Sequence, residues 1–85
     1  MKSTGDLYAM RLLVSDKPGV LVRVLLVFSR RGINIETLKV SRSDSTGFSD
    51  IYITLYYSGA TLPGIGLQLE KLVDVVKVEV FPVAE

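Results

Sequence analysis

The residues best suited to chemistry lie in one short segment, residues 14–21 (VSDKPGVL), where an apolar stretch meets an acid, a proline and a glycine. A helix-forming apolar segment follows, so the amides of Gly19, Val20 and Leu21 would lie at a helix start, without intrahelical acceptors. That end of a helix dipole suits a carboxylate. Asp16 could accept a hydrogen bond from an ammonium group. An α-amino acid carries both groups, so this segment is a candidate recognition loop.

Asn34 is the second candidate, because it follows Gly32 at the start of a predicted strand. Its side-chain amide could reach a ligand at a subunit contact, or it could bond to the local backbone, as turn residues commonly do. The loop at residues 14–21 has an equally ordinary explanation as a turn that begins a helix. The residues alone favour that explanation and leave both alternatives open.

The chain has no cysteine and no histidine, and its formal net charge is +1. These absences remove disulfides, thiol nucleophiles and the commonest general base. Asp50, Asp44 and Glu36 show no spacing typical of paired catalytic carboxylates or of a metal site. We therefore expect neither catalysis nor metal binding, and no strong attraction to nucleic acid or to a membrane. Without a signal peptide or a long apolar run, the expected location is the cytoplasm.

The elements that must position these residues follow from hydrophobic spacing and turn residues. Strands are predicted at residues 7–14, 34–41, 48–57 and 75–81, and helices at 20–31 and from Thr61 to about Leu72. With right-handed crossovers this order predicts an α+β, ferredoxin-like βαββαβ sandwich, in which a four-stranded antiparallel sheet carries both helices on one face. We expect a single domain over residues 1–85, with a core at about residues 7–81. Hydrophobic residues make up 48% of this short chain, an excess that predicts an interface.

A third feature is the aromatic segment at residues 47–53 (GFSDIYI). It is faintly similar to the strand of an RNA-recognition motif on which bases stack. Asp50 on that face, the low net charge and the presence of only Tyr8 in the first strand argue against RNA binding. We expect instead that an open sheet face with Tyr52 and Tyr56 meets a protein partner.

Three segments of the sequence are characteristic in combination: residues 16–21 (DKPGVL), 28–36 (FSRRGINIE) and 69–78 (LEKLVDVVKV). Together they resemble the ACT domain of acetolactate synthase (acetohydroxyacid synthase) small regulatory subunits. The first segment is general to ACT domains, whereas RRGINIE and KLVDV are more specific to this subfamily. The resemblance covers about residues 10–81, which is nearly the whole chain.

The resemblance implies a non-catalytic regulatory subunit of branched-chain amino acid biosynthesis that forms a homodimer and modulates the catalytic large subunit. Valine, or another effector such as isoleucine, would bind between protomers at Asp16, Gly19 and Asn34 and at the amides of Val20 and Leu21. The family often has asparagine in place of Asp16. No cofactor is implied for this chain, since thiamine diphosphate, Mg and FAD are expected on the catalytic partner. The alternative is a stand-alone amino-acid-sensing ACT module for another enzyme or regulator.

Overall fold

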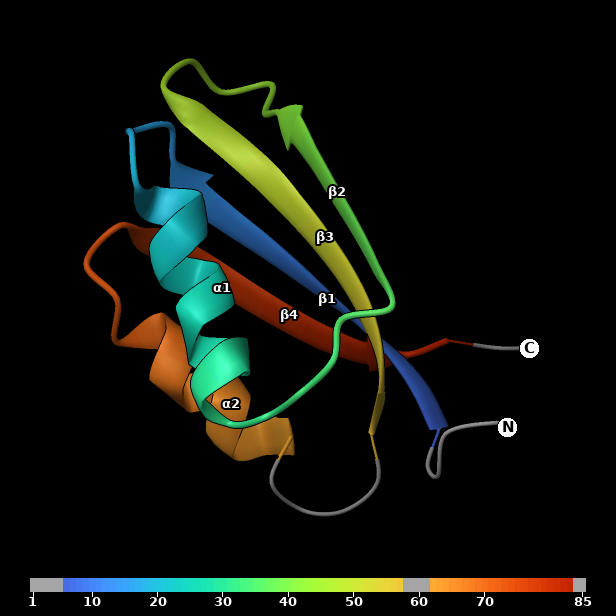
Figure 1. Ribbon diagram of the computed structural model, residues 1–85. Coiled ribbons are helices and arrows are strands. Elements are labelled where there is room, and N and C mark those ends of the chain that lie inside the picture. Colours follow the sequence, from blue (N-terminus) through green and yellow to red (C-terminus); the bar gives the residue numbers. More distant parts are fainter. Residues whose placement is uncertain (1–5, 58–61, 84–85) are drawn as a thin grey trace.

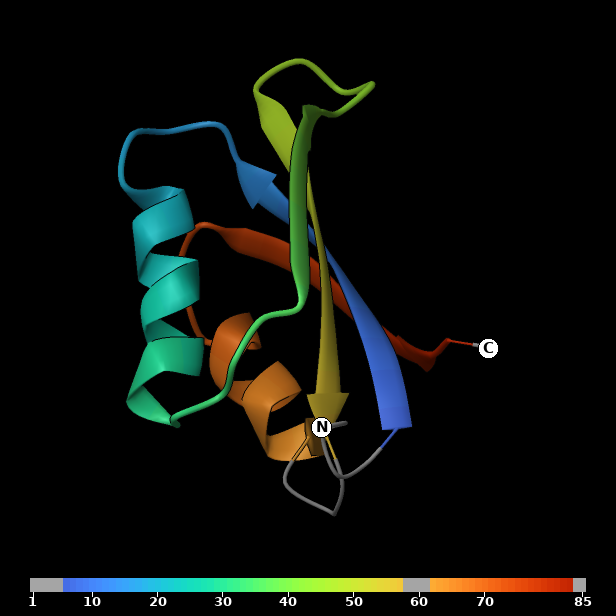
Figure 2. The ribbon, with the colours of Figure 1, turned by 45° about the vertical axis from the view of Figure 1, so that its right-hand side comes forward.

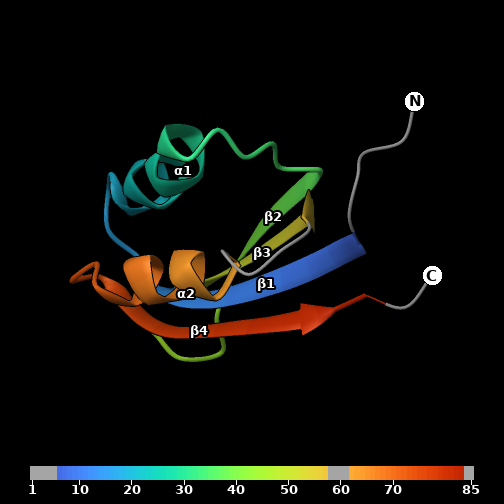
Figure 3. The ribbon, with the colours of Figure 1, turned by 90° about the horizontal axis from the view of Figure 1, so that it is seen from below.

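Two strand-helix-strand units follow one another along the chain in the computed structural model, which describes residues 6–57 and 62–83 (Figure 1). The elements are β1 (Asp6–Ser15), α1 (Val20–Arg30), β2 (Thr37–Arg42), β3 (Phe48–Tyr57), α2 (Leu62–Glu70) and β4 (Val75–Pro82). The sheet has the order β2-β3-β1-β4, and all neighbouring strands are antiparallel. Figures 2 and 3 show both helices on the same side of the sheet. The predicted ferredoxin-like arrangement is confirmed.

The core lies between the helices and the two central strands, β1 and β3. Side chains alternate between the faces of a strand, so one set from each strand points toward the helices. On β3 this set includes the three residues whose alternation was visible in the sequence, Ile51, Ile53 and Leu55, and all are buried. The largest fully buried side chains of the core are Phe28, Met10, Leu12, Ile51, Ile53, Leu55, Ile65, Leu69 and Val24.

Glycines in the left-handed conformation mark both ends of α1. Gly19 is the N-cap with φ 84°, and Gly32 follows the last turn with φ 69°. The Gly32 N–H donates to the Ser29 carbonyl and the Ile33 N–H donates to the Phe28 carbonyl, each at 3.0 Å. This pattern is a Schellman motif, in which Gly32 ends the helix.

The predicted start of the second strand is wrong. Strand β2 begins at Thr37 rather than at residue 34, so Asn34 lies in the connection between α1 and β2. Ile33 and Ile35 pack against the core from this connection, and the Glu36 N–H is bonded to the Thr54 carbonyl of β3 at 2.7 Å just before the strand begins. Asn34 lies between them and is exposed to solvent.

The predicted end of the second helix is also too late. Helix α2 ends at Glu70, and the Leu72 N–H then donates to the Leu69 carbonyl at 3.0 Å, which is a tighter i to i−3 turn. Ile65 and Leu69 face the core, whereas Leu72 is only partly buried. Thr61, the predicted start of this helix, lies outside the described residues.

Apolar side chains stay exposed on β2 and on α1. Leu38 and Val40 share the helix-covered face of β2 but are 42% and 47% exposed. On α1, Val22 and Leu26 are 60% and 40% exposed, one helical turn apart. We call these four residues the β2-side patch. Strand β2 is also an edge strand, so its outer backbone groups have no neighbouring strand among the residues that the structure describes.

Candidate functional site

The loop between β1 and α1 is held by backbone hydrogen bonds to two distant parts of the chain. The Ser15 N–H donates to the Asp74 carbonyl at 2.8 Å, just before β4. The Asp16 N–H donates to the Gly47 carbonyl at 2.9 Å, in the hairpin between β2 and β3. The recognition loop predicted from the sequence is therefore fixed on both sides.

The side-chain carboxylate of Asp74 adds contacts to the loop and to α1. Its Oδ2 accepts a hydrogen bond from Arg23 Nη2 at 2.7 Å, and its Oδ1 lies 3.8 Å from Lys17 Nζ. The Asp74 side chain is only 15% exposed, so the Arg23 bond is partly shielded from water. One acidic residue thus connects the loop, the first turn of α1 and the start of β4.

Asp16 presents its carboxylate near the surface. Its side chain is 46% exposed, and Oδ2 lies 3.8 Å from Nη1 of Arg42, which ends β2. Such an exposed pair contributes at most about 1 kcal/mol. The carboxylate therefore remains accessible to an incoming cation, although Arg42 competes for it.

The start of α1 offers fewer donors than the sequence suggested. The Val20 N–H already donates to the Lys17 carbonyl at 3.3 Å. Helix geometry leaves the Leu21 amide without an intrahelical acceptor. Within the described residues no side chain caps this end of α1 in its place. A Cβ added at Gly19 would lie 3.6 Å from Arg23 Nη1, which is ordinary contact, so the φ of 84° rather than a lack of space favours glycine here.

Asn34 does not lie near the loop within one protomer. The loop precedes α1 and Asn34 follows it, so about 16 Å of helix separates them (Figure 1). Asn34 instead lines a separate hollow of about 340 Å³. The other residues that line it are Arg31, Gly32, Ile33, Glu36, Tyr56 and Tyr57. The structure brings Asp16, Gly19, Val20 and Leu21 together and leaves Asn34 at the far end of the helix.

The sequence analysis did not identify the residues that hold the loop. Asp74 accepts from Arg23 and from the loop backbone, Gly47 accepts from the Asp16 N–H, and Arg42 forms an ion pair with Asp16. Asp74 belongs to the quoted LEKLVDVVKV segment, but no role followed from that position. Its partner Arg23 is 51 residues away, and no local pattern indicates such a pair. A family-wide pattern of paired changes at these positions is the signal that could have found it.

The described residues 6–57 and 62–83 contain no cluster of acidic side chains that could hold a metal ion. In that same part of the chain, neither helix has the length and apolar character needed to cross a membrane.

Comparison with known families shows which family this chain belongs to. A family model described as the AHAS (acetohydroxyacid synthase) small subunit-like ACT domain matches residues 10–77. The chain belongs to this family. The match includes the loop, Asn34 and Asp74, so the whole candidate site lies inside the ACT domain.

Relatives of this ACT domain agree with the family model. The acetolactate synthase small subunit of Mycolicibacterium smegmatis is 41% identical over 78 residues, which are 92% of this chain and 46% of that protein. The probable acetolactate synthase small subunit of Methanothermobacter thermautotrophicus is 42% identical over 73 residues, or 86% of this chain and 44% of that protein. The chain spans less than half the length of these relatives.

Solved structures show the same fold. The small subunit of acetolactate synthase from Thermotoga maritima superposes with a TM-score of 0.78 at 38% identity, covering 89% of this chain and 46% of that one. The ACT domain from GTP pyrophosphokinase of Chlorobium tepidum has a TM-score of 0.76 at 23% identity, covering 92% of this chain and all of that one. The second match supports the fold alone.

Proposed function

We propose that this ACT domain is a regulatory, non-catalytic part of acetolactate synthase that binds a branched-chain amino acid such as valine between two protomers. Membership of the small-subunit family supports the link to acetolactate synthase. The observation that carries the binding proposal is the position of the loop and Asn34 at opposite ends of α1. Residues that one protomer keeps apart can meet only across an interface between two copies.

The β2-side patch is the interface we propose. Two copies related by a two-fold axis normal to the sheet would place their β2 strands side by side and antiparallel. The exposed Val22, Leu26, Leu38 and Val40 of both copies would then become buried. Their α1 helices would also run antiparallel, so the start of one helix would lie beside the end of the other. The loop of one protomer would thus approach Asn34 of the partner subunit.

The groups at this junction match the two charges of an α-amino acid. The ligand ammonium would bind the accessible carboxylate of Asp16, in competition with Arg42. The ligand carboxylate would accept a hydrogen bond from the Leu21 amide at the positive end of α1. Gly19 leaves room for its approach, and the side-chain amide of Asn34 of the partner subunit can bond to either group.

Effector binding across the interface would change how the two domains are held together, and by linkage that arrangement would change affinity for the effector. The catalytic subunit of acetolactate synthase would respond to the altered dimer surface. Thiamine diphosphate, Mg and FAD would belong to that catalytic partner, so this chain would supply regulation only.

Mixed dimers test the shared site directly. We expect Gly19→Asp to abolish valine binding by blocking and repelling the carboxylate, and Asn34→Ala to weaken it severely. In heterodimers of the two variants, one site combines both defects and the other has none. Random 1:1 mixing should therefore restore about one quarter of wild-type sites by calorimetric stoichiometry, because half the dimers are mixed.

A site built within one protomer would give no restoration in this mixture, and that result would rule out the proposal. Gly19→Asn is the control for Gly19→Asp, because it has nearly the same shape, tolerates a positive φ and carries no charge. Rates of acetolactate formation by the catalytic subunit, with and without this chain and valine, test the regulatory role. An unchanged rate in all mixtures would contradict it.

A further inference from the structure

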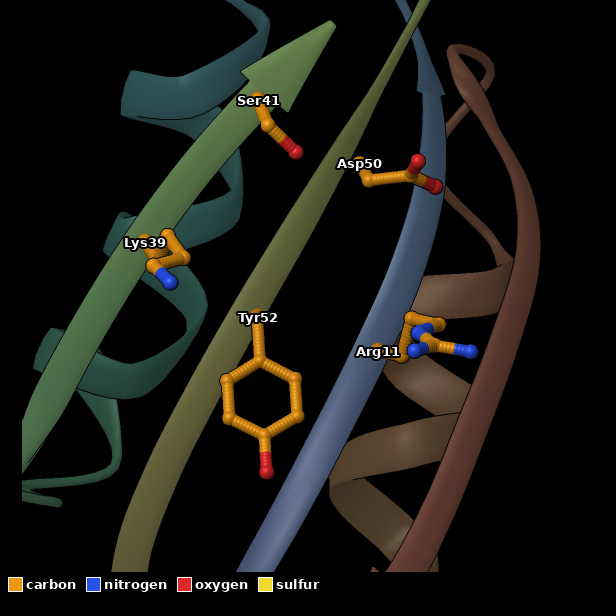
Figure 4. A pocket seen from close by; sticks show the side chains of 5 residues that line it. All are labelled: Arg11, Lys39, Ser41, Asp50 and Tyr52. Carbon is orange, nitrogen blue, oxygen red and sulfur yellow. The ribbon is translucent and has the colours of Figure 1, made fainter. Parts of the chain in front are cut away.

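The helix-free face of the sheet carries a second hollow that the amino-acid site does not use. It has a volume of about 480 Å³ and is lined by Arg11, Lys39, Ser41, Asp50 and Tyr52 (Figure 4). These residues come from β1, β2 and β3, so the most regular part of the fold supports them. We propose that this hollow binds a free mononucleotide, with the base or ribose against Tyr52 and the phosphate near the two cations.

The strand register places a cation on each side of Tyr52. Lys39 of β2 and Arg11 of β1 are both its direct cross-strand partners. Figure 4 shows the Tyr52 side chain between the strands that carry them, with the face of its ring toward the open side. Tyr52 is partly buried, and a partly exposed aromatic face beside positive charge can serve as a platform for a nucleobase, because every base has a π-face and a nearby phosphate.

The charges in this hollow have no partners within the described part of the chain. Arg11, Lys39 and Asp50 form no side-chain ion pair or hydrogen bond there. Glu79 lies opposite Arg11 in the register, yet its carboxylate oxygen lies 3.3 Å from Lys77 Nζ instead. Arg11 and Lys39 are therefore available to an anion.

The polar groups of the hollow are spread along the sheet. Asp50 lies two residues along β3 from Tyr52, so its backbone is about 6.6 Å along the strand from the row that carries the cations. A nucleotide can place its phosphate near Arg11 and Lys39 while a ribose hydroxyl or base amine donates to Asp50 or Ser41.

A long nucleic-acid strand fits this face less well than a single nucleotide. Strand binding needs a continuous positive groove that follows the phosphate backbone. Here Asp50 and Glu79 interrupt the positive charge on both sides of the hollow. The inference goes beyond the proposed regulatory function and does not depend on it, because the hollow lies on the face opposite the helices.

The test uses the ¹⁵N-labelled chain titrated with AMP, adenosine, inorganic phosphate and a short single-stranded RNA. AMP should shift the amides of the hollow residues and should bind about ten-fold more tightly than adenosine or phosphate, since each of these offers only one of the two contacts. Tyr52→Leu should weaken AMP binding by roughly 5-fold to 100-fold through lost stacking. Tyr52→Phe keeps the ring and should retain binding.

Two charge variants complete the design. Arg11→Gln and Lys39→Gln should each weaken AMP binding and reduce its dependence on salt. Lys71→Gln removes the same charge from an exposed position after α2 and should leave binding unchanged. The proposal is overturned if phosphate alone binds as tightly as AMP, if Tyr52→Phe and Tyr52→Leu lose binding equally, or if RNA binds far more tightly over a larger surface.

Discussion

Arg23 and Asp74 lie 51 residues apart in the sequence, and the Arg23 Nη2 donates a hydrogen bond to Asp74 Oδ2 at 2.7 Å. The bond joins the first turn of α1 to the residue that precedes β4. Because the Asp74 carbonyl also accepts from the Ser15 N–H, the same residue holds the loop through both its side chain and its backbone. Asp74 therefore acts on the site by fixing the position of the loop.

Asp74→Asn should lower the free energy of unfolding by about 1 kcal/mol, since it weakens a charged hydrogen bond that is partly shielded from water. Thermal unfolding should show a fall in Tm of about 4–8 °C per kcal/mol for a domain of this size. Glu79→Gln is the matched control, because its pair with Lys77 is exposed on both sides and should contribute little. Equal losses in the two variants would contradict this role for Asp74.

Asp16→Asn should weaken binding of a zwitterionic amino acid by several-fold. The substitution replaces the carboxylate that would bind the ligand ammonium with a neutral amide oxygen, which is a weaker acceptor for a charged donor. Loss of the exposed pair with Arg42, which lies at 3.8 Å, offsets only a small part of this effect. Calorimetry with valine measures the change, with Asp44→Asn as an exposed control of equal charge. Unchanged or tighter binding would contradict the role of the Asp16 carboxylate in binding the ammonium group.

Val40→Lys should weaken the proposed dimer. Pairing with β2 of a second copy would bury the residue 40 side chain together with the rest of the β2-side patch. A buried, unpaired ammonium group is strongly unfavourable. Leu67→Lys makes the same change at a more exposed position on α2 and should leave the dimer intact. Sedimentation equilibrium distinguishes them, and equal dissociation constants would exclude β2 as the paired edge.

Gly66→Ala should stabilise the domain by about 1 kcal/mol, since alanine is the better helix former. An added Cβ would lie 3.8 Å from a methyl group of Val80 and 4.0 Å from one of Val78, which is ordinary contact. Urea unfolding provides the measurement. Gly32→Ala is the opposite control, because its φ of 69° strains any residue with a Cβ and should make the domain less stable.

The strands and their faces could be predicted because alternation along β3 is a local property of the sequence. The ends of α1 could be predicted for the same reason, since Gly19 and Gly32 mark them directly. The start of β2 could not, because Ile33 and Ile35 continue an alternating pattern while they pack against the core and not in the sheet.

The candidate site was predicted in part. Asp16, Gly19 and Leu21 are neighbours in sequence, so their proximity required only a correct helix start. The engagement of the Val20 N–H by the Lys17 carbonyl depends on the exact turn geometry and has no sequence signature. The supports at Gly47 and Asp74 depend on tertiary structure, which a local pattern cannot encode.

The two backbone bonds of the loop have a consequence for folding. The acceptors for Ser15 and Asp16 come from Asp74 and Gly47, so the loop reaches its final shape only after the hairpin and β4 have joined β1. Contacts this distant in sequence form late and slowly. Hydrogen exchange at these two amides should therefore require opening of the sheet, and a truncated chain that lacks β4 should bind no effector even if α1 is intact.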